Sequence, residues 1–165
     1  MFDTINGIPL HPLVVHGVVV LLPLAILGTL LIAIRPQWRV PYGVLVVGAA
    51  LVATILCPIA TSSGEELEKR VGDPGEHAEL GDQLVWFALA LLITSAALVY
   101  LQWRRERQDT EPAGATLTVV AVLAVVAAVA CGVQVYRVGD SGARAAWGDA
   151  TGSLVAPTVA PPAAV

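Results

Sequence analysis

Charged side chains are scarce in this sequence. Only 13% of its 165 residues are Asp, Glu, Lys or Arg, while 56% are hydrophobic. A soluble domain usually carries about 25% charged residues, so the balance excludes an ordinary water-soluble domain and indicates a membrane protein. The net charge of −4 also disfavours nucleic acid as a partner, because phosphate binding needs a basic patch.

Cysteine is scarce as well, since the chain has only two, Cys57 and Cys131. The sequence has no Cys-x-x-Cys pair, so it indicates neither a disulfide framework nor a zinc knuckle, and c-type haem attachment is excluded. The two cysteines could pair if their helices touch. The alternative is that each is a small apolar filler, which is the usual role of a buried cysteine.

Long apolar runs are what the sequence has in place of charge. Four runs follow one another, none of them containing Lys, Arg, Asp or Glu, and each reaches the roughly 20 residues that a helix needs to cross a bilayer. We therefore predict an all-α, integral membrane four-helix bundle over residues 1–150, followed by a disordered Ala/Pro/Val-rich tail over 151–165. The predicted spans are residues 14–34, 42–60, 84–103 and 115–136.

The connections between the spans predict an orientation. The first, residues 35–41, and the third, residues 104–114, lie on one side and hold five arginines in few residues. The positive-inside rule then places both termini and the second connection, residues 61–83, outside the cytoplasm. The sequence thus predicts a multi-pass membrane protein. Asp3 stands where a cleaved signal peptide would carry positive charge, so the first span is expected to be retained.

Polar segments on the outer side have local signals of their own. In the second connection, Ser63 and Glu66 fit a capping box, which predicts a short amphipathic helix. Residues 72–74, Gly-Asp-Pro, would end that helix and start the next one. After the last span, Gly139 and Gly142 indicate a turn.

The three histidines are the main candidates for a functional site. His11 and His16 lie at the start of the first span, and His77 precedes the third, so the threading places all of them on the outer side. A titratable group at membrane depth is costly and is a functional candidate by default. Imidazole is a common ligand of haem and of metals. The leading hypothesis is one b-type haem between His16 and His77. Lys69, Arg70 or Arg144 would be available for its propionates.

Other uses of the same residues remain open. His11, His16 and His77 could form a copper or zinc site, or a proton relay. Alternatively they are structural: His11 a cap, His16 a hydrogen-bond partner across the bundle, and His77 a solvated surface residue. The polar side chains expected to support a site here are Glu66, Glu79, Asp140 and Arg144.

Four short motifs stand out along the chain: Leu-His-Pro-Leu-Val-Val-His at 10–16, Gly-Glu-Glu at 64–66, His-Ala-Glu-Leu-Gly at 77–81 and Gly-Asp-Ser-Gly-Ala at 139–143. Over about residues 8–148 the chain resembles, by these motifs, the bacterial four-helix membrane family called domain of unknown function 2231. The resemblance implies a protein of the bacterial cytoplasmic (inner) membrane, and an electron-transfer role, because some relatives are joined to Rieske or cytochrome-type redox domains. The expected partners are the lipid bilayer and a redox membrane partner or a second copy.

Two positions depart from the family pattern. Relatives often follow the second histidine with an aromatic residue and proline, where this chain has Gly17 and Val18, and many have a histidine where Asp140 stands. The leading prediction is a non-catalytic redox or cofactor-binding subunit. The alternatives are a structural or accessory membrane protein without a cofactor, and a copper- or zinc-handling protein. Nothing in the sequence indicates an enzyme.

Overall fold

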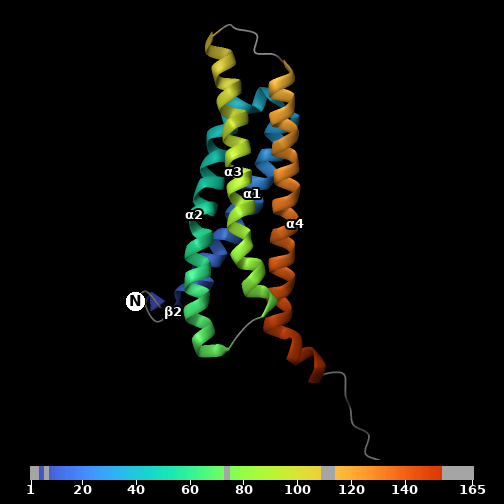
Figure 1. The fold of residues 1–165 in the computed structure, drawn as a ribbon. Coiled ribbons are helices and arrows are strands. Elements are labelled where there is room, and N and C mark those ends of the chain that lie inside the picture. Colours follow the sequence, from blue (N-terminus) through green and yellow to red (C-terminus); the bar gives the residue numbers. More distant parts are fainter. Residues whose placement is uncertain (1–3, 6–7, 73–74, 109–113, 154–165) are drawn as a thin grey trace, which may run out of the picture.

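The computed structural model describes residues 4–5, 8–72, 75–108 and 114–153. Apart from one pair of two-residue strands and a 3₁₀ turn, the described residues form long helices, so the all-α prediction is confirmed (Figure 1). The elements are β1 (Thr4–Ile5) and β2 (Ile8–Pro9), which pair in antiparallel fashion, α1 (Leu10–Ile34), η1 (Pro36–Trp38), α2 (Arg39–Val71), α3 (Glu76–Gln108) and α4 (Gly114–Ser153).

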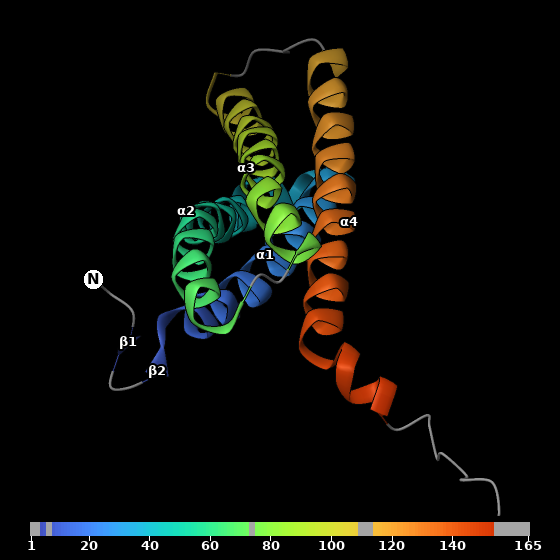
Figure 2. The same cartoon turned by 60° about the horizontal axis from the view of Figure 1, so that its bottom comes forward.

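The four helices form an antiparallel bundle. Each packs against its neighbours in chain order, α4 packs back against α1, and α1 and α3 are diagonal to each other with few contacts. Figures 1 and 2 show the helices side by side, with β2, the end of α2 and the start of α3 at one end of the bundle. All four are long and apolar enough to span a membrane, with windows of mean hydropathy from 2.3 to 2.7. The predicted number of spans is therefore confirmed.

The bundle interior has two apolar clusters separated by a hydroxyl layer. One cluster centres on Leu22 and Leu91, and the other on Ile32 and Leu98. Between them lie Thr29 and Ser95, both fully buried. Ser95 donates its hydroxyl to the Leu92 carbonyl of its own helix at 3.1 Å, as a small hydroxyl can do without breaking a helix. Among the described residues, the other buried polar side chains are Arg39 and Gln134, and the rest of the buried interior is apolar.

The short outer helix predicted in the second connection is a continuation of α2, not a separate element. Ser63 does not cap a helix; its hydroxyl donates to the carbonyl of Ala60, one turn earlier, at 3.0 Å. Nothing between Ala60 and Gly72 breaks a helix, so α2 runs from the apolar region into water. Gly72 ends it with φ +98° and an N–H bond to the Glu68 carbonyl at 2.8 Å, a backbone conformation that glycine adopts at little cost.

The turn predicted after the last span is also wrong. Helix α4 continues through Gly139 and Gly142 to Ser153, bending near that end as Figure 2 shows. An ion pair between Asp140 and Arg144, 3.0 Å apart and one turn apart, supports the helix there. The disordered tail predicted for 151–165 overlaps α4 at its first residues, and the rest of it lies outside the described residues, as do Asp73 and Pro74 of the predicted helix start.

The two helical hairpins, α1–α2 and α3–α4, repeat one pattern of burial. Counted from His11 in α1 and from His77 in α3, each buried position of α3 has a buried counterpart in α1. The diagonal placement of α1 and α3 is what a two-fold rotation about the bundle axis would produce. We conclude that the fold is an internal repeat. The matching pairs are Val14 and Leu80, Val18 and Leu84, Leu22 and Ala88, Ala25 and Leu91, Thr29 and Ser95, Ile32 and Leu98, and, in α2 and α4, Val46 and Ala124, Ala50 and Ala128, Ala53 and Cys131.

Enlarging a small residue of this interior tests the packing. Ala128, fully buried in α4, has no room for extra methylenes, so Ala128→Leu should lower the free energy of unfolding by about 1–3 kcal/mol. Its repeat counterpart, Ala50→Leu, should lower it by a similar amount. The neighbouring Val129 is 54% exposed, so Val129→Leu should have little effect. Unfolding in detergent, followed by circular dichroism, measures all three, and equal losses at 128 and 129 would contradict the packing.

Candidate functional site

His11 lies between α1 and α2 in the first turn of α1, half-buried. Its Nδ1 donates a proton to the carbonyl of Ala60 at 2.9 Å and lies 3.4 Å from the Ser63 hydroxyl. The ring rests on Gly64, where a Cβ would come within 3.1 Å of the imidazole Cε1. The histidine therefore joins the first helix to the second by one hydrogen bond and by packing that only glycine accommodates freely.

His77 makes the same contact between α3 and α4. Its Nδ1 donates to the carbonyl of Val138 at 3.1 Å and lies 3.4 Å from the Ser141 hydroxyl. A Cβ at Gly142 would come within 2.9 Å of the imidazole Cε1. We call this arrangement and its counterpart at His11 the two His–Gly contacts. They occupy equivalent places in the two hairpins, with carbonyl, serine and glycine at the same spacing.

His16, by contrast, is exposed and bonds only within its own helix. Its Nδ1 donates a proton to the Pro12 carbonyl one turn earlier at 2.5 Å. The expectations for the structural roles are therefore corrected: the histidines that bond between helices are His11 and His77, not His16, and His77 is not a freely solvated residue. The reason is helical geometry, since His16 is turned by about 140° from His11 around α1.

The three histidines lie toward the same end of the bundle, but the structure does not bring their rings together. His11 faces α2, His77 faces α4 and His16 faces outward. Within the described ranges, no group of three or more His, Cys, Asp and Glu side chains is placed to hold a metal ion. The predicted three-histidine copper or zinc site is thus not formed by these side chains. The contacts of His16 and His77 likewise give no support to a haem shared between them.

The predicted supporting residues do not point to a common ligand either. Glu66 pairs with Lys69 at 2.6 Å, and Asp140 accepts from Arg144 at 3.0 Å, each within one helix. Glu79 is exposed. Exposed pairs of this kind contribute about 0.2–1 kcal/mol or nothing measurable. They stabilise the helix ends and leave the histidines without a shared carboxylate partner in the described residues.

Polar groups that the sequence reasoning passed over do hold helices together. Gln134, buried in α4, donates from Nε2 to the Leu80 carbonyl of α3 at 2.9 Å. The sequence does contain a signal for this bond: Gln134 is a lone amide inside an apolar run, and such a group needs a partner in the bundle. The two cysteines are both free thiols, Cys57 and Cys131, buried in the same apolar cluster.

Arg39 is the other residue whose structural role the sequence did not reveal. From the sequence it is only one of the positive charges in a connection between spans. It is 6% exposed. Its Nε donates to the Ile32 carbonyl at 2.9 Å, one terminal nitrogen to the Ala33 carbonyl at 3.1 Å, and the other to the Gln102 side-chain oxygen at 3.2 Å. Arg39 therefore satisfies the free carbonyls at the end of α1 and ties that end to α3.

Comparison with known proteins gives one match. The model of the family described as "Predicted membrane protein (DUF2231)" matches residues 7–154, which include all four helices and both His–Gly contacts. No curated protein and no solved structure matches the chain.

The His–Gly contact at His77 can be tested by adding a side chain at Gly142, the glycine on which the ring packs. Gly142→Ala should displace the ring and weaken its bond to Val138. The free energy of unfolding should fall by about 0.6 kcal/mol, the average for interhelical hydrogen bonds in membranes, and by no more than about 1.7 kcal/mol. A Cβ at the nearby Gly139 meets nothing within 4 Å, so Gly139→Ala should be neutral or stabilising. In a His77→Ala background the Gly142→Ala penalty should vanish. A penalty that persists there, in detergent unfolding, would show that the ring is not what the glycine accommodates.

Proposed function

The chain belongs to the DUF2231 family of predicted membrane proteins, and we propose that it serves as a non-catalytic accessory subunit of the bacterial cytoplasmic membrane. The observation that carries this proposal is that two of its three histidines form hydrogen bonds between helices. His11 and His77 each donate the Nδ1 proton to a carbonyl of the adjacent helix and pack on a glycine. At the predicted outer end, these contacts hold α1 to α2 and α3 to α4.

The opposite end of the bundle has the character of a membrane surface on the cytoplasmic side. Trp38 and Tyr42 pack edge to face at 5.9 Å between ring centroids, and the Arg107 guanidinium lies 4.2 Å from the centroid of the Trp103 ring. Aromatic residues of this kind concentrate at membrane interfaces, and arginine concentrates on the cytoplasmic side. This supports the orientation proposed here, with both termini outside.

Cysteine labelling tests that orientation. In a chain with Cys57→Ala and Cys131→Ala, the exposed positions Glu79 and Gln37 mark the two ends of the bundle. A membrane-impermeant maleimide should label Glu79→Cys in intact spheroplasts, and Gln37→Cys only after the membrane is made permeable. The reverse pattern would invert the orientation. Labelling of both positions in intact spheroplasts would place them on one side of the membrane and contradict the single span, α2, between them.

A second candidate function is a redox subunit with one b-type haem, or with copper or zinc, on His16. The observation that favours it is that Nδ1 of His16 is engaged by the Pro12 carbonyl, which leaves Nε2 free for ligation, as in many histidine ligands of metals. The contacts of His16 with Pro12 and of His77 with Val138 give no support to a haem held between the two rings. The other ligand would come from a redox membrane partner or a second copy of the chain.

One spectrum separates the two candidates. For the accessory subunit, the protein purified in detergent should show no haem bands in the reduced-minus-oxidised spectrum and no stoichiometric copper or zinc by elemental analysis. For the redox subunit, Soret and α bands should be present, lost in His16→Ala, and kept in Leu13→Ala, which changes another exposed side chain of the same turn. Haem bands with that mutant pattern would overturn the accessory proposal.

A further inference from the structure

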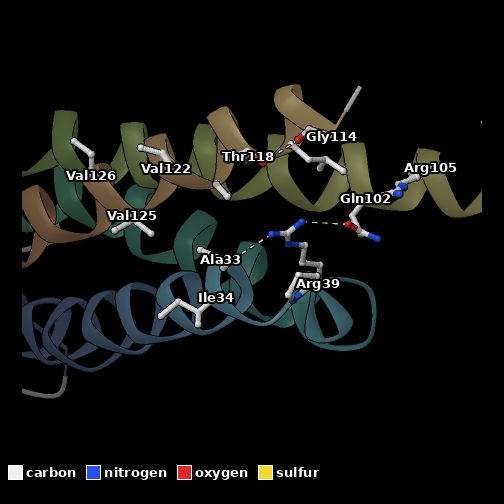
Figure 3. A pocket seen from close by; sticks show the side chains of 13 residues that line it. Ala33, Ile34, Arg39, Gln102, Arg105, Gly114, Thr118, Val122, Val125 and Val126 are labelled. Atoms are coloured by element: carbon white, nitrogen blue, oxygen red, sulfur yellow. Dashed lines mark hydrogen bonds between the residues drawn. The ribbon is translucent and has the colours of Figure 1, made fainter. Parts of the chain in front are cut away.

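A cavity of about 600 Å³ lies at the end of the bundle opposite the histidines. Residues from the end of α1, the start of α2, the end of α3 and the start of α4 surround it. Its polar lining is Arg39, Gln102, Arg105 and Thr118. Figure 3 shows the Arg39 guanidinium between the Ala33 carbonyl and Gln102. This volume lies in the range of small-molecule sites, about 300–1,000 Å³.

The charge of the cavity is positive. Among the described residues, every hydrogen bond of the buried Arg39 goes to a neutral acceptor, two carbonyls and one amide oxygen. The C-terminal end of α1 offsets part of this charge, since a helix end carries about half a unit. Arg105 lines the same cavity, so among the described lining residues the charged side chains are both arginines. An anionic group there would accept charge-assisted hydrogen bonds from them.

The rest of the cavity wall is apolar and extends along α4. Val122, Val125 and Val126 line it together with Ile34 of α1, and Figure 3 shows the three valines continuing along α4 away from the arginine. Val122 and Val126 are more than half exposed, so this side opens where lipid chains surround the bundle. A ligand would therefore meet cations at one end of the cavity and hydrocarbon at the other.

We propose that this cavity binds an anionic phospholipid. Its phosphate lies between Arg39 and Arg105, and the upper part of an acyl chain lies along the α4 valines. Basic pockets between transmembrane helices recognise anionic lipid headgroups in this way. Free phosphate would use the arginines but not the valine wall. The site is independent of the histidines and of any cofactor bound there.

Lipid binding to the full chain in a zwitterionic detergent tests the proposal. Native mass spectrometry, with thermal stabilisation as a second readout, should show binding of phosphatidylglycerol in preference to phosphatidylcholine. Arg105→Gln should weaken phosphatidylglycerol binding about fivefold, the usual effect of one cation near a headgroup. The control is Arg104→Gln, which removes the same charge from the adjacent residue, whose guanidinium lies 5.9 Å from the Tyr100 ring centroid and outside the cavity lining.

A second pair of variants tests the apolar wall without touching the arginines. Val122→Trp should fill the cavity mouth and reduce lipid binding, while Val119→Trp, on an exposed part of α4 outside the lining, should leave it unchanged. Equal binding of both lipids would overturn the proposal, as would equal effects of the two arginine variants. Stabilisation by inorganic phosphate as strong as that by phosphatidylglycerol would show an anion site rather than a lipid site.

Discussion

The structure depends on one constraint: inside a bilayer, every polar group must find its partner within the protein. The backbone meets this by forming helices almost throughout the described residues. Most of the few polar side chains at depth meet it by bonding to carbonyls, as Gln134 does to Leu80 and Arg39 does to Ile32. Among the described residues, the hydroxyl of Thr29 is buried without a hydrogen-bond partner. Because lipid chains are as apolar as the helix surfaces, such bonds and close packing, rather than hydrophobic burial, hold the helices to one another.

The internal repeat explains why the histidines do not form one site. A two-fold axis along the bundle places His11 and His77 at the same depth in equivalent hairpins, so each ring faces the second helix of its own hairpin. The glycines on which the two rings pack, Gly64 and Gly142, belong to the same repeated unit. Bringing the two rings to one ligand would require breaking both hairpin contacts.

The repeat is broken at the other end, where the lipid cavity is proposed. Arg39 and Arg105 stand at equivalent distances along the chain from His11 and His77. Arg39 follows the break between α1 and α2 and turns back onto the free carbonyls of α1, whereas α3 continues past Arg105 to Gln108 as helix. Both arginines line the cavity, but Arg39 is buried against the end of α1 whereas Arg105 is only partly buried.

The sequence alone determined the number of spans, their approximate limits and the shared side of the three histidines, because the length of an apolar run and the parity of the connections suffice for these. It also carried the family motifs. Which ring faces which helix was decided only by tertiary packing, since rotation of a helix about its axis depends on its neighbours. The same holds for Ser63 and Gly142: capping and turn signals describe local preferences, and helices already packed from end to end override them. Arg39 is buried because the start of α2 lies against the end of α1, where its side chain bonds to the last carbonyls of that helix.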